Sequence, residues 1–214
     1  METNAFSVVL EKNPVISIKV IPGHFSTSNA HTNNYLDVGG LKSDALVARN
    51  VARELAIPYL SSTLVNAIVC MEKTEVIGAY LAEELSQAGN SVLNTDGEIY
   101  VLTPVSNVNG KLIFLDSVVE RIREQNIILL VASISSGQTV TSAMECISYY
   151  GGRLAGISAL FCSSRDRLEQ EVHALFTSED IPGYRLFSTN ECELCKAGHR
   201  VDAIINSDGY TLIG

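Results

Sequence analysis

The stretch that decides the fold reads IILLVASISSGQT and covers residues 127–139. Residues 127–131 are all apolar, which is typical of a strand in a parallel sheet that is covered on both faces. Small hydroxyl residues then surround one glycine, Gly137, and a helical pattern begins at Thr139. We therefore predict a buried strand that leads through a short loop directly into a helix.

This loop has the features of an anion site. A helix that begins directly after it points unpaired N–H groups and the positive end of its dipole at one place. Glycine lets the backbone come close to an anion, and ligands of open α/β sheets bind at the carboxyl ends of the strands. An ordinary turn with a serine N-cap is the alternative. The predicted phosphate-binding residues are Ser135, Ser136, Gly137, Gln138 and Thr139.

Strand and helix patterns alternate on both sides of the loop. Apolar runs predict strands at residues 64–69, 91–94 and 154–161, and amphipathic patterns predict helices at residues 43–56, 76–85 and 139–150. Repeated strand–helix–strand units predict an α/β fold with a doubly wound, mainly parallel sheet flanked by helices. Residues 98–102 and 111–115 flank an Asn-Gly turn and predict a hairpin that projects from the sheet.

The chain of 214 residues suits a single domain. We place the core sheet at about residues 41–181. The two ends, residues 1–40 and 182–214, are rich in Gly, Asn, Ser and Pro, and we expect them to form an irregular hood over the sheet.

Composition excludes several classes of protein. A formal net charge of −9 argues against nucleic acid as a partner, because phosphate backbones are held by clustered Lys and Arg. No apolar run is long enough to cross a bilayer, and the first residues lack a secretory signal pattern. We therefore expect a cytoplasmic protein without a membrane partner. Five cysteines, an odd number, do not suggest a disulfide framework, and Cys70, Cys146 and Cys162 should be buried.

Three segments in the right order resemble type I phosphoribosyltransferases. Residues 131–157 resemble the phosphoribosyl-pyrophosphate loop of that family together with the helix after it. Residues 68–79 lie where the family has its pyrophosphate loop. Residues 25–37 look like the early segment of orotate phosphoribosyltransferases. The resemblance covers about residues 20–165. It implies a five-stranded parallel sheet with a hood, and transfer of ribose phosphate from phosphoribosyl pyrophosphate, with Mg²⁺, to a base.

The resemblance also implies roles for individual residues. The 5′-phosphate would lie on residues 135–139, and the hairpin at 104–110, with Lys111 beside it, would form a lid. A homodimer is expected, with helix 43–56 in its interface. The base would lie near Tyr35 and Asp37, and the pyrophosphate near Glu72, Lys73 and Thr74.

The sequence departs from this family at three places. Where the family has two adjacent acids that bind the ribose hydroxyls, this chain has Ala132 and Ser133. Losing two charge-assisted hydrogen bonds of about 1.5–3 kcal/mol each weakens binding. Glu75 would repel a pyrophosphate, and the lid has Lys111 as its nearest cation. We therefore expect a 5′-phosphorylated ribose ligand with weak or absent transfer. A non-catalytic regulatory module and a structural protein without ligand are the alternatives.

Cys192 and Cys195 form a CxxC pair that a metal site could use. His199 is the one further ligand close by in the sequence, so we expect no tightly bound zinc. His24, His31 and His173 are expected on the surface or in loops. Glu72 is interpreted as either a hydrogen-bonded core carboxylate or a ligand contact.

Overall fold

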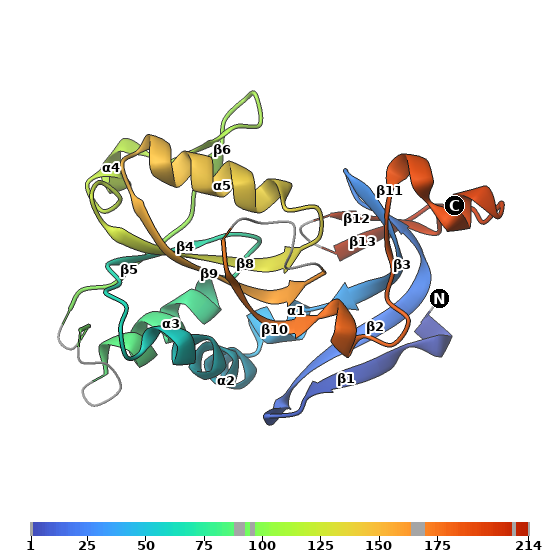
Figure 1. Cartoon of the computed structure of the whole chain (residues 1–214), viewed down its shortest axis with the longest axis horizontal. Helices are drawn as coiled ribbons and strands as arrows, with labels where there is room; N and C mark the ends of the chain where they lie inside the picture. The colour runs from blue at the N-terminus through green and yellow to red at the C-terminus, as the bar shows by residue number, and fades with distance from the viewer. Residues whose placement is uncertain (1, 88–92, 95–96, 164–169, 207–208, 214) are drawn as a thin grey trace.

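The computed structural model describes residues 2–87, 93–94, 97–163, 170–206 and 209–213 (Figure 1). The strand predicted at 91–94 falls partly outside these residues, and its described part, Leu93 and Asn94, forms a bend.

The central sheet has five parallel strands in the order β10-β9-β8-β4-β5. It confirms the predicted α/β class and the five-stranded parallel sheet. The strands are β4 (Ala67–Cys70), β5 (Tyr100–Leu102), β8 (Asn126–Ile134), β9 (Arg153–Cys162) and β10 (Val172–Thr177). Strand β8 lies in the middle, and its residues 127–132 are all buried.

Helices cover both faces of this sheet (Figure 1). Helices α2 (Ala45–Ala56) and α3 (Glu75–Ser86) pack on one face against Ile128 and Leu130, and α5 (Gln138–Tyr149) packs on the other face against Leu129 and Val131. Alternate residues of β8 therefore enter two separate apolar clusters. Both faces are apolar for this reason, which explains the unbroken apolar run in the sequence.

The two chain ends form a second sheet, in the order β11-β3-β2-β12-β13, with β1 paired to β2. Its strands are β1 (Phe6–Leu10), β2 (Asn13–Ser26), β3 (Ala30–Asp37), β11 (Leu186–Ser188), β12 (Ala203–Asn206) and β13 (Gly209–Leu212). We call it the hood sheet. The expectation that these ends are irregular is wrong, because antiparallel and parallel pairing satisfies their backbone groups.

The projecting hairpin is smaller than predicted. Residues 100–102 are the edge strand of the parallel sheet, and the hairpin consists of β6 (Val105–Ser106) and β7 (Leu112–Ile113). Its turn is closed by a hydrogen bond from the N–H of Gly110 to the carbonyl of Asn107, and Gly110 has a φ of 74°. A left-handed φ suits glycine at this place.

Helix 43–56 is divided at Asp44 into α1 (Gly39–Ser43) and α2. The Asp44 carboxylate accepts hydrogen bonds from the N–H groups of Leu46 and Val47, at 2.9 and 3.1 Å, and so begins α2. The apolar face of α2 packs inside the chain, while Leu46, on another face of the helix, is 68% exposed.

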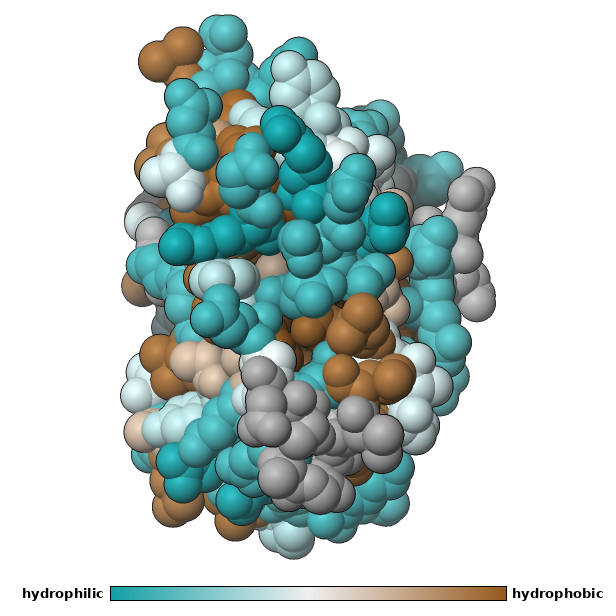
Figure 2. All heavy atoms as spheres, turned by 90° about the vertical axis from the view of Figure 1, so that its left-hand side faces the viewer, coloured by the Kyte–Doolittle hydropathy of each residue, from teal (hydrophilic) through white to brown (hydrophobic). Residues whose placement is uncertain are grey.

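Short elements connect these parts. They are α4 (Asp116–Val119), α6 (Glu193–Lys196) and the 3-10 helices η1 (Glu2–Asn4), η2 (Ile57–Tyr59), η4 (Ser178–Asp180) and η5 (Thr189–Glu191). Among the described residues, no helix is long and apolar enough to cross a membrane. On the face shown in Figure 2, hydrophilic residues cover most of the surface and apolar residues form separate patches.

Gly156 lies at a tight contact in the core. The register between β8 and β9 shifts by one residue just before it, and a Cβ at Gly156 would lie 2.5 Å from Cε1 of Tyr59. Tyr59 is buried, and its hydroxyl is 2.9 Å from that of Ser158. Glycine at 156 is therefore what lets the Tyr59 ring lie against β9.

We expect Gly156→Ala to lower the free energy of unfolding by about 1–3 kcal/mol, because the added methyl group forces the ring away from its place. Gly40→Ala is the matched control, since a Cβ there meets no atom within 4 Å. Urea unfolding of both variants tests this. Equal stabilities would contradict the packing described here.

Candidate functional site

A cavity of about 760 Å³ opens at the carboxyl end of β8, between the parallel sheet and the hood sheet. Most of the residues predicted to bind a ligand line it, although they come from distant parts of the sequence. They are Tyr35, Asp37, Glu72, Lys73, Ala132, Ser133, Ser135, Ser136, Gly137, Gln138 and Thr139.

The 135–139 loop forms one wall of the cavity. Gly137 is the N-cap of α5 with a left-handed φ of 84°, and no side chain of the described residues caps this helix. The N–H groups of the first turn can therefore donate hydrogen bonds to another partner. The far side of the loop is fixed to the end of β9, because the hydroxyl of Ser163 donates to the carbonyl of Ser135 at 3.1 Å.

The turn after β4 forms the opposite wall. Glu72 and Lys73 are consecutive non-glycine residues, and both have left-handed φ values, 55° and 64°. This conformation is costly for such residues. It is held by Thr74, which is fully buried and donates to the carbonyls of Met71 and Leu130 at 2.9 and 3.2 Å. Thr74 thus supports the turn from below and does not line the cavity.

The Glu72 side chain reaches across to β8. Its Oε2 accepts hydrogen bonds from the N–H groups of Ala132 and Ser133, at 3.1 and 3.0 Å. Burial raises the pKa of this carboxyl, while the two N–H donors and the charge of Lys42 act in the opposite direction. Of the two interpretations of Glu72, the hydrogen-bonded carboxylate is seen in the structure, and its place on the cavity wall also permits ligand contact.

The hood sheet supplies the third wall. Tyr35 lies in a group of aromatic rings, with ring centroids 4.9 Å from Tyr210 and 5.9 Å from Phe25. Burial, followed by the charges of Asp37 and Tyr210, raises the pKa of Tyr35. Asp37 accepts a hydrogen bond from the N–H of Gly39 at 2.9 Å, which turns the chain into α1.

Two more charged residues lie on the cavity wall, and of these Lys42 was not predicted from the sequence. Lys42 of α1 lines it and donates from Nζ to the carbonyl oxygen of Glu72 at 2.9 Å. Glu75 lines it as well and accepts from the hydroxyl of Thr103 at 3.0 Å. Lys42 was missed because α1 has no recognisable motif. Lys111 lies in the hairpin turn and does not line the cavity.

Two of the three histidines, His24 and His31, are not on the surface or in loops as the sequence predicted. His24 and His31 lie on β2 and β3 and are only 3% and 7% exposed, because the hood is a sheet and both side chains point into its covered side. His173 is half-buried on β10, with its ring against Tyr59. The three cysteines expected in the core, Cys70, Cys146 and Cys162, are buried.

Comparison with known proteins finds similar folds among solved structures. No protein-family model and no curated protein matches the sequence. Among solved structures, the chain is similar to adenine phosphoribosyltransferase from Thermoanaerobacter pseudethanolicus, with 16% identity over 67% of this chain and 88% of that chain, and a TM-score of 0.50. It is also similar to UMP synthase of Leishmania donovani, with 15% identity over 84% of this chain and 36% of that chain, and a TM-score of 0.55.

Both similarities concern the fold, since the sequence identities are low. The chain spans about a third of the UMP synthase and most of the adenine enzyme. Together with the five parallel strands and the hood sheet, these matches show that the chain has the type I phosphoribosyltransferase fold.

Proposed function

We propose that the cavity binds a 5′-phosphorylated ribose ligand, either phosphoribosyl pyrophosphate with Mg²⁺ or a nucleotide. The observation that carries this proposal is the 135–139 loop at the start of α5, with a left-handed Gly137 and a helix end without a side-chain cap. Such an arrangement favours a phosphate group. The base then lies toward Tyr35, where the aromatic group of the hood meets the cavity.

Glu72 supplies a carboxylate close to Ala132 and Ser133, which have none of their own. The orotate phosphoribosyltransferases that this chain resembles have, at these two positions, the acids that bind the ribose hydroxyls. Here the carboxylate of Glu72 lies beside both positions, at 3.1 and 3.0 Å from their N–H groups. Its Oε1 makes no hydrogen bond within the described residues, so this oxygen is available to accept one from a ribose hydroxyl.

The charges on the wall favour binding over transfer. Lys42 and Lys73 line the cavity, but Asp37, Glu72 and Glu75 line it too, so the positive charge is outweighed. A leaving pyrophosphate needs cations where its charge develops. Lys111 is the cation nearest to the hairpin lid, and it lies away from the cavity wall. We therefore propose weak or absent transferase activity.

A regulatory binding module is the second candidate. It uses the same cavity and differs only in having no chemistry. The excess of acids on the wall favours it, because binding of a single phosphate at the 135–139 loop does not require the pyrophosphate wall to be positive. For either candidate we expect the protein to be cytoplasmic and to form a homodimer.

Gly137→Val should weaken binding of ribose 5-phosphate by about tenfold or more, equivalent to about 1.4 kcal/mol, because the side chain lies where the phosphate approaches the backbone. Gly151→Val is the matched control. Gly151 ends the same helix with a φ of 81°, so both variants bear a similar backbone strain of about 1–3 kcal/mol. Calorimetric titration should show lost affinity for Gly137→Val alone. Equal affinities of the two variants would remove the loop from the site.

Transfer of ribose phosphate to orotate should be very slow or undetectable. The reason is the acidic wall, together with a lid whose lysine lies away from the cavity. A steady-state assay of orotidylate formation with Mg²⁺ and phosphoribosyl pyrophosphate measures this. Turnover in the ordinary enzyme range of about 1–10³ per second would show that the site is catalytically complete. The proposal of weak or absent activity would then be wrong.

The pKa of Glu72 leads to a pH dependence of stability. A carboxyl whose pKa is raised on folding binds more protons in the folded state, so its favourable contribution is complete below the unfolded value and is lost as pH rises through the folded value. The stability of the parent protein relative to Glu72→Gln should therefore be greater near pH 4 than near pH 7. Urea unfolding at several pH values tests this, and a difference that stays constant with pH would contradict the raised pKa.

A further inference from the structure

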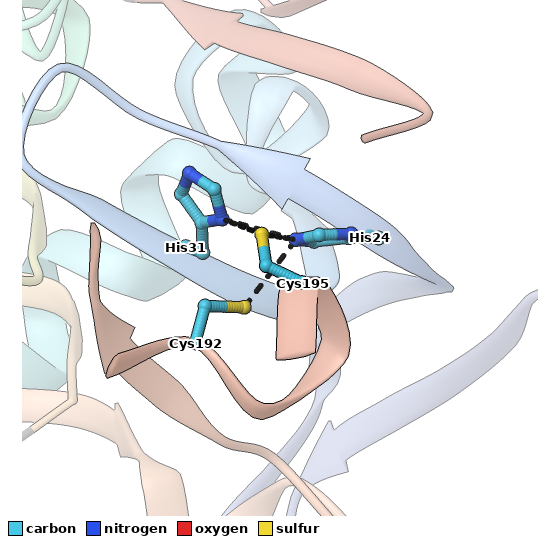
Figure 3. A group of neighbouring side chains, drawn as sticks. All are labelled: His24, His31, Cys192 and Cys195. Atoms are coloured by element: carbon cyan, nitrogen blue, oxygen red, sulfur yellow. Dashed lines mark hydrogen bonds between the residues drawn. The ribbon is translucent and has the colours of Figure 1, made fainter. Parts of the chain in front are cut away.

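Four side chains with metal-binding atoms meet where α6 lies against strands of the hood sheet (Figure 3), and none of them lines the cavity. His24 comes from β2 and His31 from β3, while Cys192 is the N-cap of α6 and Cys195 lies within that helix. One ligand atom from each residue lies within 4.8 Å of all the others. His24, His31 and Cys192 are at most 7% exposed, whereas Cys195 is exposed at the edge of the group.

We propose that His24, His31, Cys192 and Cys195 bind one Zn²⁺ ion in a closed, tetrahedral structural site. The site is independent of the proposed function. Two thiolates and two imidazoles are a common ligand set for zinc, and four protein ligands leave no open position for catalysis. Binding converts both thiols to thiolates and releases two protons, so the bound site carries no net charge.

Four of the six distances between the ligand atoms agree with a tetrahedron around zinc, and the other two are within 4.8 Å. Bond lengths of about 2.3 Å to sulfur and about 2.05 Å to nitrogen give edges of about 3.4 Å between two nitrogens and about 3.6 Å between nitrogen and sulfur. His24 Nε2 lies 3.0 Å from His31 Nδ1 and 3.4 Å from Cys192 Sγ. Cys195 Sγ lies 3.7 Å from His24 Nε2 and 3.4 Å from His31 Nδ1. All four distances come within 0.4 Å of these edges.

The backbone fixes His24 in the form that a metal needs. Its Nδ1 lies 3.0 and 3.1 Å from the carbonyl oxygens of His199 and Arg200. Carbonyl oxygens only accept, so Nδ1 carries the proton, and in the neutral ring Nε2 presents its lone pair to the group. A metal-bound histidine usually has this second hydrogen bond.

Hydrogen bonds alone do not explain the group well. The single lone pair of His24 Nε2 makes one good hydrogen bond, yet three possible partners lie within 3.7 Å of it. A metal ion at the centre satisfies all four ligand atoms at once.

The chain around the cysteines has little apolar burial to stabilise it. Helix α6 has four residues, and such a short helix is not stable by itself. Between residues 188 and 200, Cys192 is the one buried residue and Leu194 is half-buried. Metal binding would supply the stability that apolar burial does not. The sequence offered His199 as the one further ligand and so predicted no tightly bound zinc, whereas in the structure His24 and His31 lie beside the two cysteines and His199 contributes its carbonyl oxygen to His24.

The site would also order one wall of the cavity. His24 and His31 lie on either side of the β2–β3 turn, in which Thr27, Ser28 and Asn29 line the cavity. Fixing both histidines to α6 ties this turn to the C-terminal part of the hood sheet.

Elemental analysis tests the proposal directly. After expression with zinc and exhaustive dialysis without a chelator, we expect about one zinc per chain in the parent protein and in His199→Ala. The double variant Cys192→Ser/Cys195→Ser should lose it, while Cys146→Ala, which removes a thiol outside the group, should keep it. Zinc retained by the double variant, or lost from His199→Ala, would overturn the ligand assignment.

Two measurements on the parent chain keep the proposal testable if the double variant does not fold. Cobalt added to metal-free protein should give the visible absorption of a tetrahedral thiolate site, saturating at one equivalent. Removal of zinc by a chelator should lower the thermal midpoint by several degrees and speed tryptic cleavage after Lys196 and Arg200, which flank the site. A metal-free parent with no cobalt spectrum and no response to the chelator would overturn the site.

Discussion

Burial of strand β8 on both faces is the constraint on which the rest of the structure depends. Leu130 enters the cluster under α2 and α3, and Val131 enters the cluster under α5. The chain can leave this double burial only at the end of the strand, where Ser133 is exposed and Gly137 begins α5. The position of the cavity is therefore a consequence of the packing of the strand. Any ligand of this fold meets the backbone there, because side chains fill both faces of the sheet.

The same strand joins the two loops that form the cavity. Glu72, from the turn after β4, accepts the N–H groups of Ala132 and Ser133, while Thr74 of that turn donates to the carbonyl of Leu130. The strained φ values at Glu72 and Lys73 are thus held by contacts to β8. Strain of this kind persists where the surroundings fix it, and it is common at ligand sites. The wall opposite the 135–139 loop is therefore preorganised by contacts to β8, together with the hydrogen bonds that Thr74 and Lys42 make within and onto the turn.

The sequence predicted the parts of the fold that depend on local patterns. The apolar run at 127–131, the helix after Gly137 and the alternation of strands and helices follow from burial and hydrogen bonding along the chain, and the structure confirms them. It could not predict the hood sheet, because pairs such as Phe25 with Ala203 join opposite ends of the chain. Lys42 enters the site through a tertiary contact of the same kind, and for Glu72, which the sequence did place near the ligand, the same holds for its hydrogen-bond partners on β8. A single residue that reaches the site through a tertiary contact leaves no periodic pattern in the sequence.

The hood differs from the core in what holds it together. The first part of β2, with Ile16, Ile18 and Val20, joins one of the two large clusters that pack the parallel sheet, whereas the rest of the hood has a small buried apolar group of Ile21, Phe25 and Ala203. A small apolar group gives little stability, and proteins with small cores often add metal ligands. The CxxC pair and the two buried histidines lie where the hood sheet meets the weakly packed segment at 188–200. Since Thr27, Ser28 and Asn29 of the intervening turn line the cavity, the means by which the hood is held and the shape of the ligand site are physically linked.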